Sequence, residues 1–282
     1  MKTYLDCFPC FLQQALRAGR IAGADEQTLK KLLDEVGQML KDIPLSHTPP
    51  ETGEIIYGMI SKITGNSDPY KKIKQQNIEY AMQLYPDLKN RIKKSEDPLL
   101  TAIRLAIAGN VIDLGVNRKF DLVKDIETVL EQEFTVFDYQ RFKAGLANSD
   151  KILYLADNAG ETVFDKLLIE ELRKPVIYAV REIPVLNDVT IVEARQIGID
   201  KVATVISSGS TAPGTILKNC SPSFIEIFNN SDLIISKGQG NYEGLSGEDA
   251  PIFFLLKVKC EVIGRDLEVP PNAIILKGSE AC

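Results

Sequence analysis

The residues best suited to chemistry in this chain are carboxylates and amides that stand directly after short apolar segments. Asp157, Asn158 and Glu161 follow one such segment, and Asp188 follows the next. Oxygen donors of this kind suit a hard divalent cation that keeps open positions for water or a phosphate group. We therefore predict that Asp157, Asn158 and Asp188 bind a divalent metal ion, although Asp-Asn is also common in ordinary turns and helix caps.

Two of these carboxylates are candidates for catalysis. Either Asp157 or a water molecule on the cation is the expected nucleophile, and the sequence leaves both alternatives open. Glu161 falls one helical turn into the following segment, where we expect it to orient a water molecule or a substrate hydroxyl.

Residues that could bind an anion follow the later apolar segments. The glycine-containing loop that starts with Gly209 and Ser210 can direct backbone N–H groups at a phosphate, and Lys237 and Lys259 can neutralise its oxygens. We predict that these four residues contact the substrate. Lys257 would point the same way as Lys259 on an extended strand and could share its role. Clusters of glycine and serine are also common in loops without a ligand.

A further polar pair lies in the helical part of the chain. Asn110 and Asp113 are three residues apart and share one helical face within an apolar segment. Buried polar groups need partners, which favours a site facing the sheet and predicts both residues in substrate binding. The alternative is an interhelical hydrogen bond that is satisfied locally.

Cysteine and histidine limit the other kinds of site. An odd number of cysteines, five, in a chain without a secretory signal indicates reduced thiols. Cys7 and Cys10 form a CxxC that could hold a metal, act as a redox pair or be merely structural. We expect the pair to be independent of the metal site, unless the first helix folds back so that Cys260 completes a three-thiol cluster. His47 is the single histidine and stands in the loop-like run PLSHTPPETG, which disfavours Ser-His-Asp hydrolysis, HExxH zinc chemistry and a two-histidine iron site.

The elements that must position these residues change character near residue 148. Before it, apolar residues recur at helical spacing, which predicts an all-helical domain of six or seven helices, residues 1–148. Residues 149–282 alternate continuous apolar runs with helical segments, which predicts a Rossmann-like three-layer α/β domain with a mostly parallel sheet. Ligands of such sheets bind at the carboxyl ends of the strands. Six strands are expected, at 151–156, 175–180, 201–206, 232–236, 252–256 and 272–276.

Charge and missing motifs narrow the function. The net charge is −6, and residues 151–282 contribute 13 − 18 = −5 of it. This field disfavours nucleic acid as a partner, and an anionic ligand is expected to arrive with a metal. No apolar run of about 18 residues and no signal-peptide pattern occurs, so we expect a cytoplasmic protein without a membrane partner. Dinucleotide and P-loop motifs are absent from the sequence.

Taken in order, these motifs resemble the damage-control phosphatases, once catalogued as domain of unknown function 89. The resemblance covers essentially the whole chain and extends to the short, mostly archaeal branch through Ala108-Gly109-Asn110-x-Ile112-Asp113 and Cys7-x-x-Cys10. The motifs that carry it are Asp157-Asn158-Ala159-Gly160-Glu161, Asn187-Asp188, Gly209-Ser210-x-x-Pro213-Gly214-Thr215, Lys237-Gly238-x-x-Asn241-Tyr242 and Lys257-x-Lys259-Cys260.

The resemblance implies a metal-dependent phosphatase, a phosphoric monoester hydrolase that acts on small phosphorylated metabolites such as sugar phosphates. Its cofactor would be a divalent ion: manganese, cobalt, nickel or magnesium. The resemblance assigns Asp157, Asn158 and Asp188 to the metal, and Asn241 and Lys259 to the substrate. Two alternatives stay open: a non-catalytic protein that binds a phosphometabolite or nucleotide through the same cation, and a redox protein built on Cys7 and Cys10. The oligomeric state is not indicated.

Overall fold

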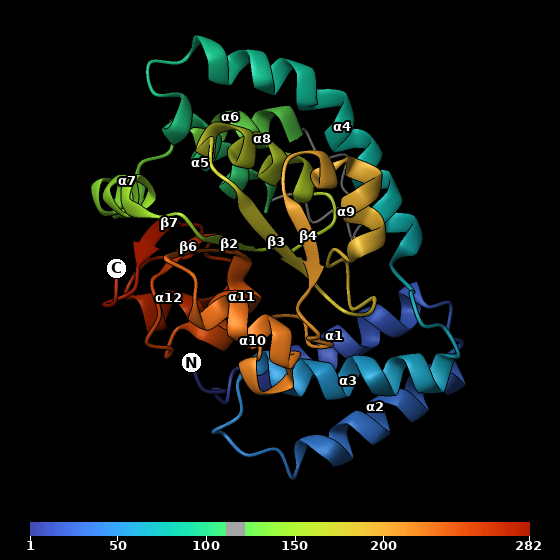
Figure 1. The fold of residues 1–282 in the computed structure, drawn as a ribbon. Coiled ribbons are helices and arrows are strands. Elements are labelled where there is room, and N and C mark those ends of the chain that lie inside the picture. The colour runs from blue at the N-terminus through green and yellow to red at the C-terminus, as the bar shows by residue number, and fades with distance from the viewer. Residues whose placement is uncertain (111–121) are drawn as a thin grey trace.

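The computed structural model describes residues 1–110 and 122–282, which are built around a seven-stranded sheet (Figure 1). The strand order is β1-β7-β6-β5-β2-β3-β4, and every neighbouring pair is parallel except β6 and β7. The strands are β1 (Phe134–Phe137), β2 (Ile152–Leu155), β3 (Val176–Val180), β4 (Thr204–Ser207), β5 (Leu233–Lys237), β6 (Ile252–Lys257) and β7 (Ile274–Gly278). The predicted α/β class, the mostly parallel sheet and the six predicted strands are confirmed.

Strand β1 corrects the prediction that residues 1–148 are all helical. It pairs with β7 at the edge of the sheet, and its residues alternate between half-buried and exposed. The expected strands are continuous apolar runs because both of their faces are covered. An edge strand of four residues with one covered face lacks that signal, which is why the prediction was wrong here.

Helices cover both faces of the sheet, so the three predicted layers are confirmed. Alternate residues of one strand point into opposite cores: Tyr154 packs into one hydrophobic cluster and Leu153 into the other. The second face carries α10 (Pro222–Asn229), α11 (Gly238–Leu245) and α12 (Glu261–Leu267). The first face carries α4 (Lys71–Lys94), α5 (Pro98–Gly109), α6 (Leu122–Glu131), α7 (Tyr139–Asn148), α8 (Thr162–Leu172) and α9 (Ile191–Ile197).

The first three helices form a cap with a core of its own. These are α1 (Cys7–Ile21), α2 (Glu26–Leu40) and α3 (Pro49–Thr64), drawn in blue in Figure 1. Their core includes Leu32 and Ile56 and also takes in Val262 of α12. The cap therefore packs against the carboxyl-terminal side of the sheet, whereas α4–α7 belong to a sheet layer.

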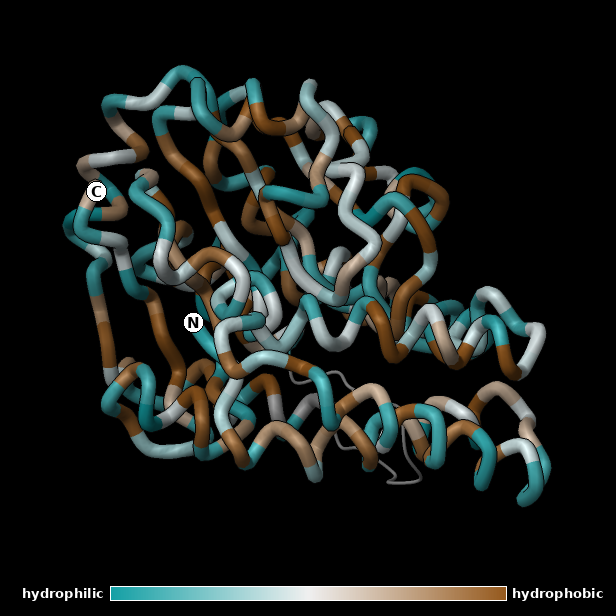
Figure 2. The backbone as a smooth tube through the Cα atoms, turned by 90° about the horizontal axis from the view of Figure 1, so that it is seen from below, coloured by the Kyte–Doolittle hydropathy of each residue, from teal (hydrophilic) through white to brown (hydrophobic). Residues whose placement is uncertain are grey.

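The core continues across the boundary expected at 148/149. Phe142 of α7 makes an edge-on ring contact with Phe253 of β6, with ring centroids 5.2 Å apart. In Figure 2 the strands form long hydrophobic segments in the interior, while the helices alternate hydrophobic and hydrophilic turns. Within the described residues, the helices are all too short or too polar to cross a membrane.

Local sequence fixes the helix starts that matter for the site. Thr48 and Glu51 form a capping box at the start of α3, which has proline at its first position. Thr190 and Glu193 form a second capping box at the start of α9. The second capping box lies two residues after Asp188 and ends the polar loop that follows β3. It thus anchors the loop that carries this carboxylate.

Candidate active site

A pocket of about 370 Å³ lies between the cap and the carboxyl ends of the strands. The cap contributes α1 and the start of α3, and the sheet contributes the segments after β2, β3, β4, β5 and β6. The polar lining residues used below are Cys7, Cys10, Gln14, Asp157, Asn158, Asn187, Asp188, Gln239, Glu243, Lys259 and Cys260. Sites at the strand ends are expected for this architecture.

The three predicted metal ligands meet in this pocket. Asp157 and Asn158 follow β2, and Asp188 lies in the loop after β3. The two segments are tied together: the N–H of Val189 donates to the carbonyl of Asp157 at 2.9 Å, and Asn158 pairs with Asp188 in an antiparallel bridge. The three side chains therefore lie on one wall of the pocket, and the hydrogen bonds between the two segments hold them there.

Asn110 joins this group from the end of α5. Its amide nitrogen donates to Asp157 Oδ2 and to Glu161 Oε2, both at 2.9 Å, and the side chain is buried. Asn158 donates to the same two oxygens, at 2.9 and 3.1 Å. These hydrogen bonds orient both amides. Because the Nδ2 atom of Asn158 is directed at Asp157 and Glu161, its Oδ1 atom points away from those two oxygens.

Glu161 and Lys237 lie behind the pocket wall. Both are fully buried, and the ammonium of Lys237 contacts Glu161 Oε1 and, at 2.6 Å, Asp165 Oδ1. Tyr154 and Tyr178 each donate a hydroxyl to Asp165 at 2.7 Å. The sequence predicted that Lys237 contacts the substrate, but in the structure it does not line the pocket. Its charge instead balances the carboxylates of Glu161 and Asp165. The side chain of the last β5 residue points into the helical layer, a direction the sequence does not reveal.

Arg181 was not among the residues singled out from the sequence. It is buried directly after β3 and donates to Asp188 Oδ2 at 2.7 Å, to Thr215 at 3.1 Å and to Asn241 Oδ1 at 3.0 Å. Asn241 in turn donates to the carbonyls of Ala156 and Lys237. Asn241 is therefore a fully engaged structural residue and does not reach the pocket. The sequence signal that could have identified Arg181 is its position, because it is a cation directly after a strand that leads to predicted metal-binding carboxylates.

The anion loop is placed differently from the expectation. Ser210 is buried and donates to the carbonyl of Gly214 at 2.8 Å. Gly209 has φ of 78°, and a Cβ there would lie 2.6 Å from the nitrogen of Ser221. The loop is folded on itself and gives only Pro213 to the pocket. Asp113 lies outside the described residues.

Lys259 is the predicted substrate residue that does line the pocket. Its side chain is exposed, and its backbone N–H donates to Gln239 Oε1 at 3.1 Å. Lys257 is the last residue of β6 and is not part of the lining. Of the two lysines, only Lys259 therefore lines the pocket.

The cysteines lie closer to the site than expected. Cys7 and Cys10 of α1 line the same pocket as Asp157, and so does Cys260. All three are free thiols, and burial raises the pKa of Cys7. The first helix therefore folds back over the strand ends, as the alternative from the sequence allowed, and the independence of the pair from the metal stays a prediction. Among the described residues, however, no three His, Cys, Asp or Glu side chains are arranged to hold a metal ion.

The charges behind the pocket do not balance. At the site the buried groups are four carboxylates and two cations: Asp157, Glu161, Asp165, Asp188, Arg181 and Lys237. A third buried cation, Lys74, forms ion pairs with Asp68 and Glu193 instead. This leaves 4 − 2 = 2 excess negative charges, and each uncompensated buried charge costs several kcal/mol. Burial raises the pKa of Asp157 well above its usual range, and the charges of Glu161 and Asp188 raise it further. Burial also raises the pKa of Asp188, against the opposing effect of Arg181.

These residues fit a divalent cation. One oxygen each of Asp157 and Asp188 is engaged in the hydrogen bonds described, and the second oxygens, with the amide oxygen of Asn158, form a set of two carboxylates and one neutral donor. Such oxygen sets suit hard cations that retain water or bind phosphate. Two positive charges would also offset the two excess negative ones.

Fold and site together define an α/β protein with an acidic, oxygen-lined pocket at its strand ends, and comparison with known proteins agrees. The damage-control phosphatase ARMT1-like domain matches residues 3–275. Damage-control phosphatase PH1575 of Pyrococcus horikoshii is 34% identical over 282 residues, which cover 98% of this chain and 97% of the relative. The chain therefore belongs to the damage-control phosphatase ARMT1-like family, as the sequence motifs predicted.

Two further comparisons support this membership. A damage-control phosphatase of Archaeoglobus fulgidus is 32% identical over 295 residues, covering 98% of this chain and 99% of the relative. The crystal structure of a DUF89 family protein from Pyrococcus horikoshii (PH1575) matches with a TM-score of 0.92 at 33% identity, covering 99% of this chain and 100% of that one. The fold described above is thus the fold of the family.

Proposed function

We propose that this protein is a phosphatase that uses a divalent metal ion to hydrolyse phosphomonoesters of small metabolites. One observation carries the proposal: two excess buried negative charges lie beside three oxygen donors that open onto a pocket lined by Lys259. The pocket volume of about 370 Å³ falls within the ~300–1,000 Å³ usual for small-molecule sites. The names of the relatives support phosphatase activity.

Asp157, Asn158 and Asp188 would hold the ion, which could be manganese, cobalt, nickel or magnesium. When bound, such an ion would offset the charge of the phosphate oxygens and polarise the phosphoryl group. Lys259 contributes an ammonium group on the same pocket and neutralises phosphate oxygens as charge develops on them. Gln239 accepts a hydrogen bond from the backbone N–H of Lys259 and so holds the backbone from which this side chain extends.

Glu161 and Asn110 act as positioning residues. Glu161 is fully buried and contacts Asn110, Asn158 and Lys237, so it holds the amides that hold Asp157. This replaces the expectation that Glu161 orients a water molecule or a substrate hydroxyl directly. Outer-shell partners of this kind typically alter metal affinity or activity by about 10–100-fold when they are lost. Arg181 has the same function for Asp188.

The proposal is tested by phosphate release. Metal-stripped protein is supplied in turn with Mn²⁺, Co²⁺, Ni²⁺ and Mg²⁺ and a panel of sugar phosphates, with Asp188→Asn as the matched inactive variant. We expect release that needs the ion and is lost in the variant. Metal-dependent binding of the same compounds without release would instead establish the non-catalytic alternative, and release without any ion would overturn the metal assignment.

A further inference from the structure

Helix α11 leads from the metal residues to another part of the pocket. It begins at Gly238, where a Cβ atom would overlap Asp157 Oδ2, and its residues Gln239, Gly240 and Glu243 line the pocket. Glu243 stands five residues after Gly238. At a rise of about 1.5 Å per residue, the two positions are about 7.5 Å apart along the helix axis. Glu243 therefore lines the same pocket as the metal residues, more than one helical turn away from them.

Gln239 connects Glu243 with Lys259. Its Oε1 accepts from the backbone N–H of Lys259 at 3.1 Å, and its Nε2 donates to Glu243 Oε1 at 3.4 Å. The same Nε2 lies 3.5 Å from Cys260 Sγ. One amide thus holds the segment of the pocket lysine and the carboxyl of Glu243 together. A ligand with its phosphate at the metal residues and Lys259 can therefore present its other end to Glu243.

Glu243 carries a half-buried carboxyl with few partners. Among the described residues, its side chain receives one hydrogen bond, from Gln239, and the 3.4 Å separation is long against the usual value of about 2.9 Å. The amino group of Met1 donates to the backbone carbonyl of Glu243 at 2.8 Å and not to its carboxyl. Burial raises the pKa of Glu243 to about 7. The carboxyl therefore has acceptor sites left for a ligand.

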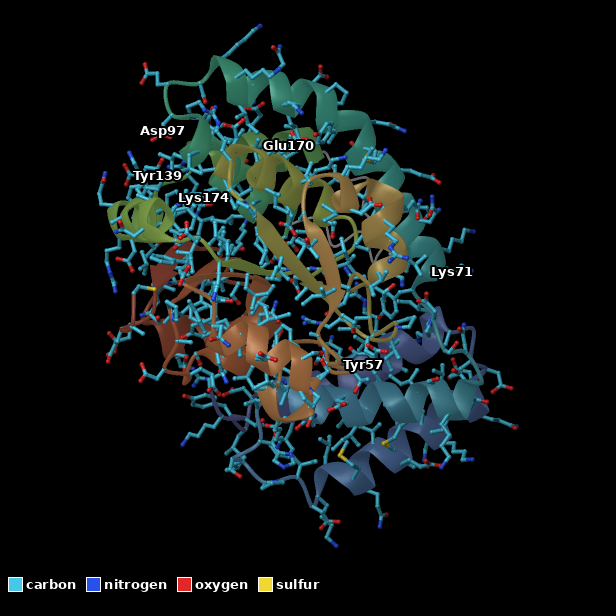
Figure 3. The ribbon with its side chains drawn as sticks, viewed as in Figure 1. Tyr57, Lys71, Asp97, Tyr139, Glu170 and Lys174 are labelled. Carbon is cyan, nitrogen blue, oxygen red and sulfur yellow. The ribbon has the colours of Figure 1, made fainter. Side chains whose placement is uncertain are left out.

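Polar groups on the cap side of the pocket are engaged more fully. The hydroxyl of Tyr57 donates to Gln14 Oε1 at 3.0 Å, and Gln14 Nε2 donates to Cys10 Sγ at 3.1 Å. Tyr57 lies on the side of α3 that faces the sheet (Figure 3). Asp6, which also lines the pocket, forms an ion pair with Arg265 at 2.5 Å. These side chains therefore have less acceptor capacity left for a ligand.

We propose that Glu243 binds a hydroxyl group of the substrate, so that the preferred substrates are phosphate esters of sugars or other polyols. This rests on the proposed function and names the residue that recognises the part of the substrate beyond the phosphate. A hydroxyl donates to a carboxylate, and hydrogen bonds to a charged group are stronger than neutral ones. A substrate without the hydroxyl would leave the carboxyl unpaired, and sites of this kind discriminate strongly against such analogues.

The test compares phosphate esters with and without hydroxyl groups on a chain of the same length. Glycerol 3-phosphate is paired with propyl phosphate, and sorbitol 6-phosphate with hexyl phosphate. For wild type we expect kcat/KM to be at least about tenfold higher for the polyol member of one pair. Glu243→Leu should bring that ratio close to one, and Glu243→Gln, which keeps one acceptor oxygen, should preserve part of it. Glu248→Leu, at an exposed position after the same helix, should leave the ratio as in wild type.

The outcomes separate this inference from the proposed function. A wild-type ratio near one in both pairs, or a ratio that Glu243→Leu leaves intact, overturns the hydroxyl site while phosphatase activity stands. A variant that lowers kcat/KM for both members of a pair by the same factor shows a structural role and overturns the hydroxyl site as well. If no compound is hydrolysed, the proposed function fails, and calorimetric binding of the same pairs to wild type and Glu243→Leu still decides the role of Glu243.

Discussion

Arg181 donates from Nε to Oδ2 of Asp188 at 2.7 Å, and the side chains are only 2% and 4% exposed. The same guanidinium reaches Thr215 and Asn241, so one residue ties the loop after β3 to the start of α11. A buried cation with three acceptors holds Asp188 in one orientation. Stability and the geometry of the site therefore depend on the same contact.

Removing Arg181 should destabilise the protein strongly. Arg181→Met leaves a buried carboxylate without its partner, which costs about 3–5 kcal/mol of unfolding free energy. The matched control is Arg265→Met, because the ion pair of Arg265 with Asp6 is 58% and 62% exposed and such pairs contribute about 0–1 kcal/mol. Urea unfolding of both variants checks this. A loss below 1 kcal/mol for Arg181→Met would show that Asp188 does not need this partner.

Lys259 and Lys257 should behave differently. Lys259→Ala should lower kcat/KM for phosphate release by at least about tenfold, or ~1.4 kcal/mol of transition-state stabilisation, because its ammonium lies on the pocket. Lys257→Ala is the control, since this residue does not line the pocket. Steady-state kinetics of both variants on one substrate are sufficient. Equal losses in the two variants would place the phosphate elsewhere.

Glu243 should make stability depend on pH. Burial raises its pKa from 4.5 to about 7, against the opposing hydrogen bond from Gln239. Between these two values the folded protein binds more protons than the unfolded chain, so the free energy of unfolding falls as pH rises through this window. Glu243→Gln stays neutral and should gain on wild type by at least about 1 kcal/mol between pH 5 and pH 8. Parallel curves of unfolding free energy against pH would contradict this.

Phosphatase activity should not depend on the thiols of Cys7 and Cys10, although a bulky group attached to Cys10 should block the pocket. Cys7→Ser with Cys10→Ser should keep kcat/KM within about twofold, because an oxygen-ligated cation does not need thiolates. Iodoacetamide should nevertheless inactivate wild type, since Cys10 is exposed on the pocket, and Cys10→Ser should resist. Metal analysis is the check: one equivalent of zinc that disappears in the double variant would show that the thiols hold a metal after all.

The sequence predicted the sheet because its strands are covered on both faces and read as continuous apolar runs, and it missed β1 because an edge strand does not. It also located Asp157, Asn158 and Asp188, since the strand-end rule needs only the order of the elements. It also indicated Asn110, because a polar residue in a buried apolar segment needs a partner, although α5 ends at Gly109 and Asn110 is its cap. These predictions depend on local pattern and topology alone.

Other features depend on side-chain direction and on long-range packing. Lys237 and Asn241 stand at the expected strand end, yet their polar groups turn inward to Glu161 and Arg181. The cap brings Cys7 and Gln14 of α1 to a pocket formed more than a hundred residues later in the chain. Only the packing of α1–α3 onto α11 and α12 decides this, and no spacing in the sequence encodes it.

The most direct measurement of the central claim is a calorimetric titration of a divalent ion into metal-stripped protein. For wild type with Mn²⁺ or Mg²⁺ we expect about one ion per chain. Asp157→Asn and Asp188→Asn should each lose at least about tenfold in affinity, with phosphate release falling in parallel and the circular dichroism unchanged. Wild-type ion affinity together with wild-type phosphate release in both variants would contradict the assignment of these carboxylates to the metal.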